Sequence, residues 1–314
     1  MAPYGIAIIG VGKISQDQHL PMIAGNADFA LKALVSQRGL REPGVPTYAT
    51  PAELFAAEPE LDAVAVCTPP SVRHAIARQA LRAGKHVLLE KPPAQTTREL
   101  DDLAAEAAKL GRVLFTTWHS QYNAAVDAAR ARLAGKRVRK LHIEWKEDVR
   151  RWHPGQDWIW QAGGFGVFDP GINALSILSR IMPAPVFVAA AELATPANRD
   201  MPIAASLTFS SPGGATEGAA LTAEFDWRQT GEQSWTIDLE TEEGERLSLT
   251  HGGSKLLVGG RLVVDEPMAE YEGIYRRFAD LLRRGESEVD AAPFGLVADA
   301  FLVGRRLVTA PFIE

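Results

Sequence analysis

Short apolar runs alternate with helical patterns over roughly the first 120 residues of the chain. The runs that predict buried strands are Gly5–Ile9, Ala30–Val35, Asp62–Cys67, His86–Leu89 and Val113–Thr117. The helical patterns are Ile14–Ala24, Pro51–Ala57, Val72–Ala83 and a segment that a capping-box pair, Thr96 and Glu99, opens and Gly111 closes. Continuous apolar strands that alternate with helices indicate a parallel sheet covered on both faces.

After about residue 185 the period changes, and we place a domain boundary near residue 120. Apolar residues alternate with polar ones over Leu221–Trp227 and Trp235–Leu239, which predicts antiparallel strands with one polar face. The pair Gly259-Gly260 predicts a two-residue hairpin turn. Helices are expected near Asp169–Arg180, Tyr271–Arg284 and Phe294–Arg306. The sequence therefore predicts an α/β protein with domains at 1–120 and 121–314, the second an α+β domain with a large, mostly antiparallel open sheet.

Composition restricts the partners and the compartment. The 314 residues include 33 Lys and Arg against 39 Asp and Glu, and this net charge of −6 disfavours nucleic acid as a partner. No apolar run approaches the length of about 18 residues that suggests a membrane span. The chain begins in a strand pattern and has the single cysteine Cys67, so we expect a cytoplasmic protein without disulfides. The histidines show no metal-ligand spacing, and no metal site is expected.

A glycine-containing turn separates the first predicted strand from the first predicted helix. In Gly10-Val11-Gly12-Lys13-Ile14-Ser15, the glycines fit a tight turn and a close approach of backbone to a pyrophosphate. Ser15 is small enough to pack where the helix meets the sheet. Amides at the start of the helix, around Lys13 and Ile14, would face the phosphates. An ordinary strand-to-helix turn is the alternative interpretation.

The residues after the second predicted strand bear on which dinucleotide binds. The segment Ser36-Gln37-Arg38 contains no acidic residue, and none follows before Glu42. An acid there would bind the adenosine ribose and repel a 2′-phosphate. Ser36 and Arg38 can instead bind a phosphate, so we expect NADP to be accepted, with NAD as a second cofactor. The alternative for Arg38 is a solvated loop arginine.

Further motifs follow the third and fourth predicted strands, and another motif lies later in the chain. They are Thr68-Pro69-Pro70, His74, Glu90-Lys91-Pro92 and the segment Gly163–Asn173. In this order they resemble the Gfo/Idh/MocA oxidoreductase family over essentially the whole chain. The resemblance implies a Rossmann fold that binds NAD or NADP through Thr68, Pro69, Pro70, His74, Glu90 and Lys91. It also implies a second domain that binds the substrate through Gly163–Asn173, and a homodimer or larger oligomer. Trp145–Gln156 is similar to the members that oxidise D-galactose and L-arabinose at C1 to the lactone.

Oxidation at C1 requires a group that takes the hydroxyl proton. Lys91 lies beyond the carboxyl end of a parallel strand, where open α/β sheets bind ligands. Asp169 faces the substrate in the family, although an aspartate before Pro170 also fits a helix N-cap. The residue four positions later is commonly histidine in the family and is Asn173 here, which cannot titrate. We expect Lys91 to be the principal acid/base and Asp169 its partner, with the reverse open, while Asn173 orients the sugar.

Aromatic residues cluster where the resemblance places the sugar. Four of the seven tryptophans lie between Trp145 and Trp160, and large rings stack on the apolar faces of pyranoses. Together with Lys91 and Asp169, the candidates for sugar binding are His119, Glu147, Trp152, His153, Asn173 and Trp227. A core or interface role is the alternative for each tryptophan. His19 and His74 are candidates to line the cofactor cleft. The rival functions are a family member acting on inositol, a sugar acid or another aldose, and a non-catalytic dinucleotide-binding regulator.

Overall fold

The computed structural model describes residues 2–313 and groups them into two compact units. Unit 1 contains the described residues up to Trp118 and the later segment Tyr271–Ala291. Unit 2 contains His119–Glu270 and the described residues from Ala292 onward. The first crossing between units lies close to the boundary expected at residue 120. The expectation that 121–314 forms one domain differs from the structure, because Tyr271–Ala291 packs with unit 1.

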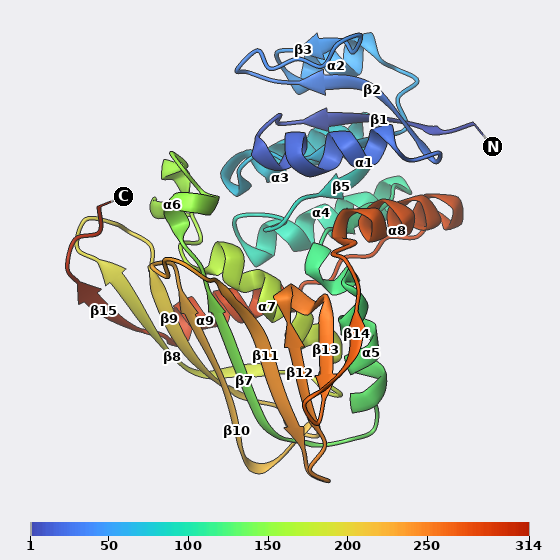
Figure 1. The fold of residues 1–314 in the computed structure, drawn as a ribbon. Coiled ribbons are helices and arrows are strands. Elements are labelled where there is room, and N and C mark those ends of the chain that lie inside the picture. Colours follow the sequence, from blue (N-terminus) through green and yellow to red (C-terminus); the bar gives the residue numbers. More distant parts are fainter. Residues whose placement is uncertain (1, 314) are drawn as a thin grey trace. The chain divides into compact units, whose positions relative to one another are not determined.

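A six-stranded parallel sheet forms the centre of unit 1 (Figure 1). Its strands are β1 (Tyr4–Ile9), β2 (Phe29–Val35), β3 (Thr47–Tyr48), β4 (Ala63–Val66), β5 (His86–Leu89) and β6 (Leu114–Thr116). The spatial order β3-β2-β1-β4-β5-β6 is that of a Rossmann fold, and the strand order reverses at β1. All predicted strands are present, and the short edge strand β3 is additional.

The predicted helices of unit 1 are present, although the one expected over Val72–Ala83 begins at Pro70. They are η1 (Ser15–His19), α1 (Leu20–Ala24), α2 (Pro51–Ala57), α3 (Pro70–Arg82), α4 (Thr97–Leu110) and most of α8 (Glu270–Arg284). The capping box of α4 is confirmed: Thr96 Oγ1 accepts a hydrogen bond from the amide of Glu99, and the Glu99 carboxylate accepts one from the amide of Thr96. Gly111 closes the helix at a φ of 59°, which glycine adopts without strain.

Helix α8 completes the core of unit 1 although it lies far from the other elements in the sequence. Phe278 has no exposed surface, and its ring stacks on Phe29 and Phe115 at centroid distances of 5.7 and 6.0 Å. Tyr275 is also fully buried and packs edge-on against Phe29. The apolar face of α8 therefore covers part of the parallel sheet's core.

Unit 2 is built on a nine-stranded sheet with the order β14-β13-β12-β11-β7-β10-β9-β8-β15. The strands are β7 (Val138–Lys146), β8 (Phe187–Pro196), β9 (Ala204–Ser210), β10 (Ala215–Asp226), β11 (Ser234–Thr241), β12 (Arg246–Thr250), β13 (Lys255–Val258), β14 (Arg261–Asp265) and β15 (Arg305–Thr309). The sheet is mostly antiparallel, as expected, but β10 pairs with β7, and β15 with β8, in parallel. Gly259 and Gly260 form the predicted hairpin turn with φ values of 57° and 80°.

Helices cover one face of this sheet (Figure 1). The helical segments of unit 2 are η2 (His119–Tyr122), α5 (Ala124–Leu133), α6 (Val149–Trp152), η3 (Asp157–Trp160), α7 (Phe168–Ile181), η4 (His251–Gly253) and α9 (Ala292–Val303). Of these, α5, α7 and α9 pack against the strands. On β9, buried Ala205, Leu207 and Phe209 alternate with exposed Ser206 and Thr208, so the other face is polar.

Two elements of unit 2 differ from the expectations. The strand β7 is not among the predicted strands, and it precedes the change of period near residue 185. The helix expected over Phe294–Arg306 ends at Val303, and the chain continues as β15. A Cβ on Gly304 would lie 2.3 Å from the Ala300 carbonyl oxygen, so this glycine permits the change of direction. In residues 2–313, no helix is both long and apolar enough to cross a membrane.

Candidate functional site

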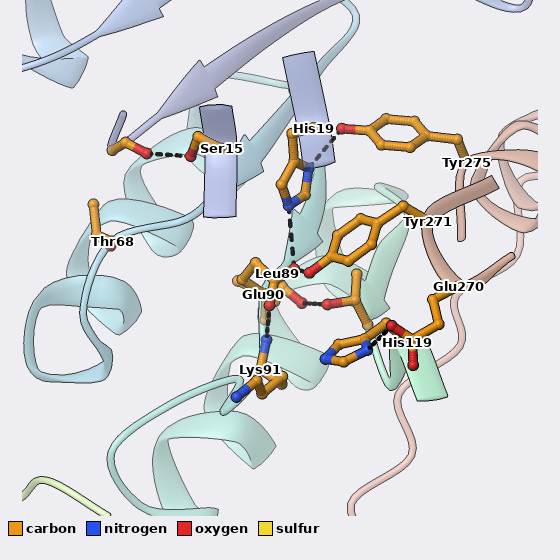
Figure 2. Close-up of polar contacts among 12 residues, drawn as sticks. Ser15, His19, Thr68, Leu89, Glu90, Lys91, His119, Glu270, Tyr271 and Tyr275 are labelled. Carbon is orange, nitrogen blue, oxygen red and sulfur yellow. Dashed lines mark hydrogen bonds and ion pairs between the residues drawn. The ribbon is translucent and has the colours of Figure 1, made fainter. Parts of the chain in front are cut away.

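The turn after β1 has the geometry that a dinucleotide requires. Gly10 has a φ of 94°, and a Cβ there would lie 2.8 Å from the backbone nitrogen of Thr68. A Cβ on Gly12 would meet no atom within 4 Å, so this position faces open space. Ser15 is fully buried and donates a hydrogen bond to the Gly10 carbonyl over 2.7 Å (Figure 2). Gly10 thus keeps the turn tight, and Gly12 leaves room beside it.

The two residues between these glycines and Ser15 lie at the start of the helix. Ile14 occupies the N-cap position of η1, a single π-helical turn that continues into α1. The ammonium group of Lys13 forms an ion pair with Asp17 one turn later, and both side chains are about half exposed. The helix expected over Ile14–Ala24 is therefore present, and it contains a π-helical turn at Ser15–His19.

Three polar residues, Ser36, Gln37 and Arg38, follow β2. Ser36 is largely buried, and its hydroxyl accepts a hydrogen bond from the amide of Leu40 over 3.2 Å. Gln37 and Arg38 are exposed. Ser36 therefore shapes this loop, and Arg38 extends from it.

The loop after β4 lies beside the glycine turn. In the described chain the buried hydroxyl of Thr68 has no hydrogen-bond partner. Pro69 is the N-cap residue of α3 and Pro70 its first residue. His74, on the same helix, contacts Asp102 of α4 over 2.8 Å. This hydrogen bond lowers the pKa of Asp102, and the charge of Arg78 lowers it further.

The residues after β5 form a buried polar cluster around Glu90 (Figure 2). Glu90 Oε2 accepts a hydrogen bond from the amide of Lys91 over 2.7 Å. Glu90 Oε1 accepts one from the Tyr271 hydroxyl over 2.6 Å and lies 3.1 Å from His19 Nε2. His19 Nδ1 lies 2.7 Å from the hydroxyl of Tyr275. Glu90 therefore ties the start of the lysine segment to η1 and α8.

The charges in this cluster favour a protonated His19. Burial opposes a positive charge on the ring, but Cys67, Tyr275 and Glu90 outweigh it and raise the pKa of His19 well above its ordinary value. Burial raises the pKa of Tyr275 to about 12, so its hydroxyl stays protonated. His19 has no exposed surface. The expectation that it lines an open cleft is therefore wrong, and it supports Glu90 instead.

Asp169 lies inside α7 rather than at its cap. The helix begins at Phe168, its N-cap residue is Val167, and no side chain caps it. Asp169 is 3% exposed, and its Oδ2 lies 3.4 Å from His153 Nε2. The N-cap alternative is therefore wrong. Asn173 follows four residues later, so it lies on the same side of the helix and is half-buried.

A second carboxylate of unit 2 lies among tryptophans. Glu147, just after β7, is 6% exposed and accepts hydrogen bonds from Nε1 of Trp227 over 3.2 Å and of Trp235 over 3.1 Å. The half-buried Trp152 lies beside Trp235, with ring centroids 5.8 Å apart. Two indole donors hold the Glu147 carboxylate in one orientation.

Trp227 has no exposed surface in this arrangement. Its ring contacts those of His153 and Trp160, each at a centroid distance of 5.2 Å. The expectation that Trp227 forms a wall against the sugar does not fit this burial. Its placement instead supports His153 by ring contact and Glu147 by a hydrogen bond.

The comparisons with known proteins indicate the same family that the sequence motifs indicate. Residues 4–118 match the Gfo/Idh/MocA model, described as an oxidoreductase family with an NAD-binding Rossmann fold. A galactose 1-dehydrogenase from Pseudomonas fluorescens is 43% identical, and the alignment covers 100% of both chains. The chain belongs to the Gfo/Idh/MocA family. Among solved structures, a D-galactose-1-dehydrogenase from Rhizobium etli has a TM-score of 0.93 and 53% identity, over 100% of this chain and 99% of that one.

A less similar solved structure shares the fold of this Gfo/Idh/MocA protein. A 3-ketoreductase from Actinomadura kijaniata, solved in complex with NADP and TDP-benzene, has a TM-score of 0.81 and 19% identity over 98% of this chain and 99% of that one. At that identity the likeness concerns the fold alone.

A further, partly buried pair in this Gfo/Idh/MocA chain involves the predicted sugar residue His119. Its Nδ1 lies 3.0 Å from a carboxylate oxygen of Glu270, and both are in unit 2. Ser120 and Asn123 donate hydrogen bonds to the other oxygen over 2.9 and 3.0 Å. Burial opposes the charge of Glu270, but His119 and these hydrogen bonds lower its pKa.

Several site residues lack any motif that marks them in the sequence. Tyr271 and Tyr275 are spaced four apart on α8, which signals a helix face but not its partner Glu90. Trp235 appears only as an apolar strand position, and Glu270 carries no pattern. These residues contact the other site residues from segments that are distant in the sequence.

Proposed function

We propose that this protein is an NAD(P)-dependent aldose 1-dehydrogenase that oxidises the anomeric C1 of D-galactose to the lactone. The observation that carries the proposal is the likeness, over the full length of this chain, to two galactose 1-dehydrogenases at 43% and 53% identity. L-Arabinose is the second substrate we propose, because it shares with D-galactose the configuration at C2, C3 and C4.

The proposed cofactor is NADP or NAD, which accepts the hydride from C1 when bound. The residues present fit it. Gly12 faces open space that a pyrophosphate can fill, and the buried Thr68 hydroxyl offers a hydrogen bond that the described protein atoms leave unused. The start of η1, around Lys13 and Ile14, presents amides suited to phosphate. The other proposed cofactor-binding residues are Gly10, Pro69, Pro70, His74, Glu90 and Lys91, together with Ser36, Gln37 and Arg38 of the loop after β2.

We assign discrimination between the two dinucleotides to the loop after β2. Arg38 and Gln37 are exposed there without a neighbouring acid, so a 2′-phosphate meets attraction rather than repulsion. In Arg38→Ala we expect kcat/KM with NADP⁺ to fall by about tenfold or more, the effect of losing a charged hydrogen bond, while the value with NAD⁺ is retained or improved. Unchanged kinetics with NADP⁺ would make Arg38 a solvated loop residue.

The proton chemistry is proposed for Lys91 and Asp169. The C1 hydroxyl must lose its proton as the carbonyl forms. Lys91 is the proposed acceptor, and its backbone is held by Glu90. Asp169, beside His153, is the proposed partner on the same hydroxyl, and the reverse assignment of the two roles is the alternative. Asn173 donates and accepts hydrogen bonds and orients the sugar.

Recognition of the other sugar hydroxyls is proposed for residues of unit 2. The Glu147 carboxylate is oriented by two indole groups and can accept from a hydroxyl. Trp152, half-buried, offers a ring face for the apolar side of a pyranose. His153 and His119 are the proposed imidazole contacts. Trp227 supports this group from the core.

The test of the function is a set of initial rates followed at 340 nm. D-Galactose, L-arabinose and myo-inositol are each supplied with NAD⁺ and with NADP⁺. We expect turnover of both aldoses and none, or far slower turnover, of myo-inositol. Preference for myo-inositol would replace the sugar assignment, and absence of NAD(P)H formation with every aldose tried would indicate a dinucleotide-binding regulator.

A double-mutant cycle tests the pairing of Lys91 with Asp169. We expect Lys91→Met and Asp169→Asn each to lower kcat by about 100-fold or more, and the double variant to lose little beyond either one. Such non-additivity is expected of groups that act as a unit. Fully additive losses would assign the two residues to separate steps.

We also propose a homo-oligomer in the cytoplasm. The support is the family resemblance. Light scattering coupled to size-exclusion chromatography measures the mass, and a single-chain mass at micromolar concentration would contradict the proposal.

A further inference from the structure

The helix α3 contains a buried arginine whose side chain is directed toward the main chain on both sides of Lys91. Arg73 is 3% exposed although arginine is among the residues least often fully buried. Its Nη1 donates to the carbonyl oxygens of Glu90, at 2.5 Å, and of Pro92. These two carbonyls bracket Lys91. The guanidinium therefore holds the peptide groups before and after the lysine.

The same guanidinium also reaches the loop after β4. Arg73 Nη2 donates to the carbonyl oxygen of Thr68. Thr68 is the residue whose backbone nitrogen would lie 2.8 Å from a Cβ on Gly10, so it lines the glycine turn. One rigid, planar group thus joins the loop beside the proposed dinucleotide site to the segment of the proposed acid/base. Its several N–H donors have a fixed geometry, which suits such a junction.

We propose that Arg73 is a positioning residue for catalysis, which fixes the Lys91 segment relative to the glycine turn. This proposal rests on the proposed function, because it takes Lys91 as the group that handles the proton. The Glu90 side chain already orients the Lys91 amide from one side. Arg73 adds the constraint on the flanking carbonyls. Misplacing a reacting group by about 1 Å costs up to about 100-fold in rate, so such a constraint affects turnover.

Two substitutions distinguish the contribution of the Arg73 charge from that of its forked arrangement of donors. Arg73→Met keeps the apolar stem and removes every donor. Arg73→Lys keeps the charge and replaces two donor nitrogens by one, which cannot serve the Thr68 carbonyl and the lysine segment together. The matched control is Arg82→Met on the same helix, because Arg82 is exposed and contacts only the surface residue Glu106 among the described ion pairs.

The first measurement is steady-state turnover of D-galactose with NADP⁺, alongside NADPH affinity and urea unfolding. We expect Arg73→Met to lower kcat by about 10- to 100-fold, with the dissociation constant of NADPH changed by less than about threefold. Arg73→Lys should recover part of this loss, and Arg82→Met should match the wild type. With D-galactose deuterated at C1, the isotope effect on kcat should rise in Arg73→Met, because hydride transfer becomes slower relative to other steps.

The second measurement does not depend on activity. Amide hydrogen exchange, read by mass spectrometry, should be faster in both Arg73 variants for peptides covering residues 86–95, and unchanged for peptides of α5. If the wild type fails to oxidise D-galactose, the proposed function fails, while this exchange result still decides the role of Arg73. If Arg73→Met does not fold, Arg73→Lys supplies both measurements.

Three results would overturn the proposal. One is a kcat in a folded Arg73 variant within about twofold of the wild type. Another is a fall in kcat that equals the loss of NADPH-binding sites, since that reflects a smaller folded fraction. The third is unchanged exchange at residues 86–95 in both variants.

Discussion

The structure distinguishes a structural from a chemical role for Asp169 better than the sequence does. The sequence allows a helix N-cap, but the side chain lies within α7, buried and 3.4 Å from His153. Asp169→Asn therefore removes a charge without removing a cap. We expect kcat to fall by about 100-fold or more and the thermal midpoint to stay within a few degrees. Asp127→Asn, an exposed substitution on α5, is the control. Near-normal kcat in Asp169→Asn would exclude Asp169 from the proton chemistry.

The Glu270 carboxylate gives a pH-dependent prediction. Its pKa is lowered in the folded state because His119, Ser120 and Asn123 compensate its burial. A lowered folded pKa contributes stability above the unfolded value of about 4.3, and this contribution is lost as the pH falls through the folded pKa.

The measurement is urea unfolding of Glu270→Gln and of the wild type from pH 3 to pH 7. We expect Glu270→Gln to be less stable by about 1–3 kcal/mol at pH 7, with the difference shrinking as the pH drops below about 4.5. Glu272→Gln, at an exposed position on α8, should show no such trend. A difference that is constant over this range would exclude the carboxylate charge as its cause.

At the residue scale, the sequence predicts the parts of the site that lie in contiguous motifs. Lys91 and Asp169 are each marked by their neighbours. The partners that hold such residues are not: Tyr271 reaches Glu90 across 181 positions, and Arg73 looks like one more helix position. A hydrogen bond between distant segments leaves no local pattern, so only the fold reveals it.

At the element scale, the two glycines of the turn after β1 differ in what an added side chain would meet. Gly10 has a φ of 94°, and an added Cβ would lie 2.8 Å from the backbone nitrogen of Thr68. Gly10→Ala should therefore reduce folding stability by about 1–3 kcal/mol or prevent folding. Gly12 has neither constraint. We expect Gly12→Ala to fold normally and to weaken dinucleotide binding by about tenfold, because its methyl group occupies the space proposed for the pyrophosphate.

Circular dichroism melting and NADPH fluorescence titration distinguish the two glycine variants. Unchanged NADPH affinity in Gly12→Ala would place the pyrophosphate elsewhere. A Gly10→Ala protein as stable as the wild type would show that the turn relaxes around the added methyl group.

The elements that the sequence predicts well are those with local causes. The capping box fixes α4, and the Gly259-Gly260 turn fixes its hairpin. The errors lie where the partner is distant. Strand β7 pairs with β10 and β11, about 80 or more positions away, and β15 exists through its pairing with β8. Strand propensity depends on such neighbours, so the short segment Arg305–Thr309 reads equally well as the end of a helix.

At the scale of the whole molecule, unit 1 is discontinuous in the sequence, because Tyr271–Ala291 belongs to it although His119–Glu270 belongs to unit 2. The sequence identifies α8 as an amphipathic helix but cannot say which sheet its apolar face covers, because any complementary apolar surface satisfies the pattern. The structure assigns it to unit 1, where Phe278 stacks on Phe29 and Phe115. The stability of the dinucleotide-binding fold therefore depends on residues far beyond its own contiguous segment.

Phe278→Ala tests this dependence in the full chain. The ring has no exposed surface, and removing a buried phenylalanine costs about 3–5 kcal/mol through lost burial and a cavity. We expect a lower urea midpoint for unit 1, and saturating NADPH should recover part of the loss because the ligand stabilises the state that binds it. Leu302→Ala, at a side chain 83% exposed, should change stability by less than about 0.5 kcal/mol. If Phe278→Ala unfolds at the wild-type urea concentration, α8 is not part of the core of unit 1, and the first 118 residues carry that core without it.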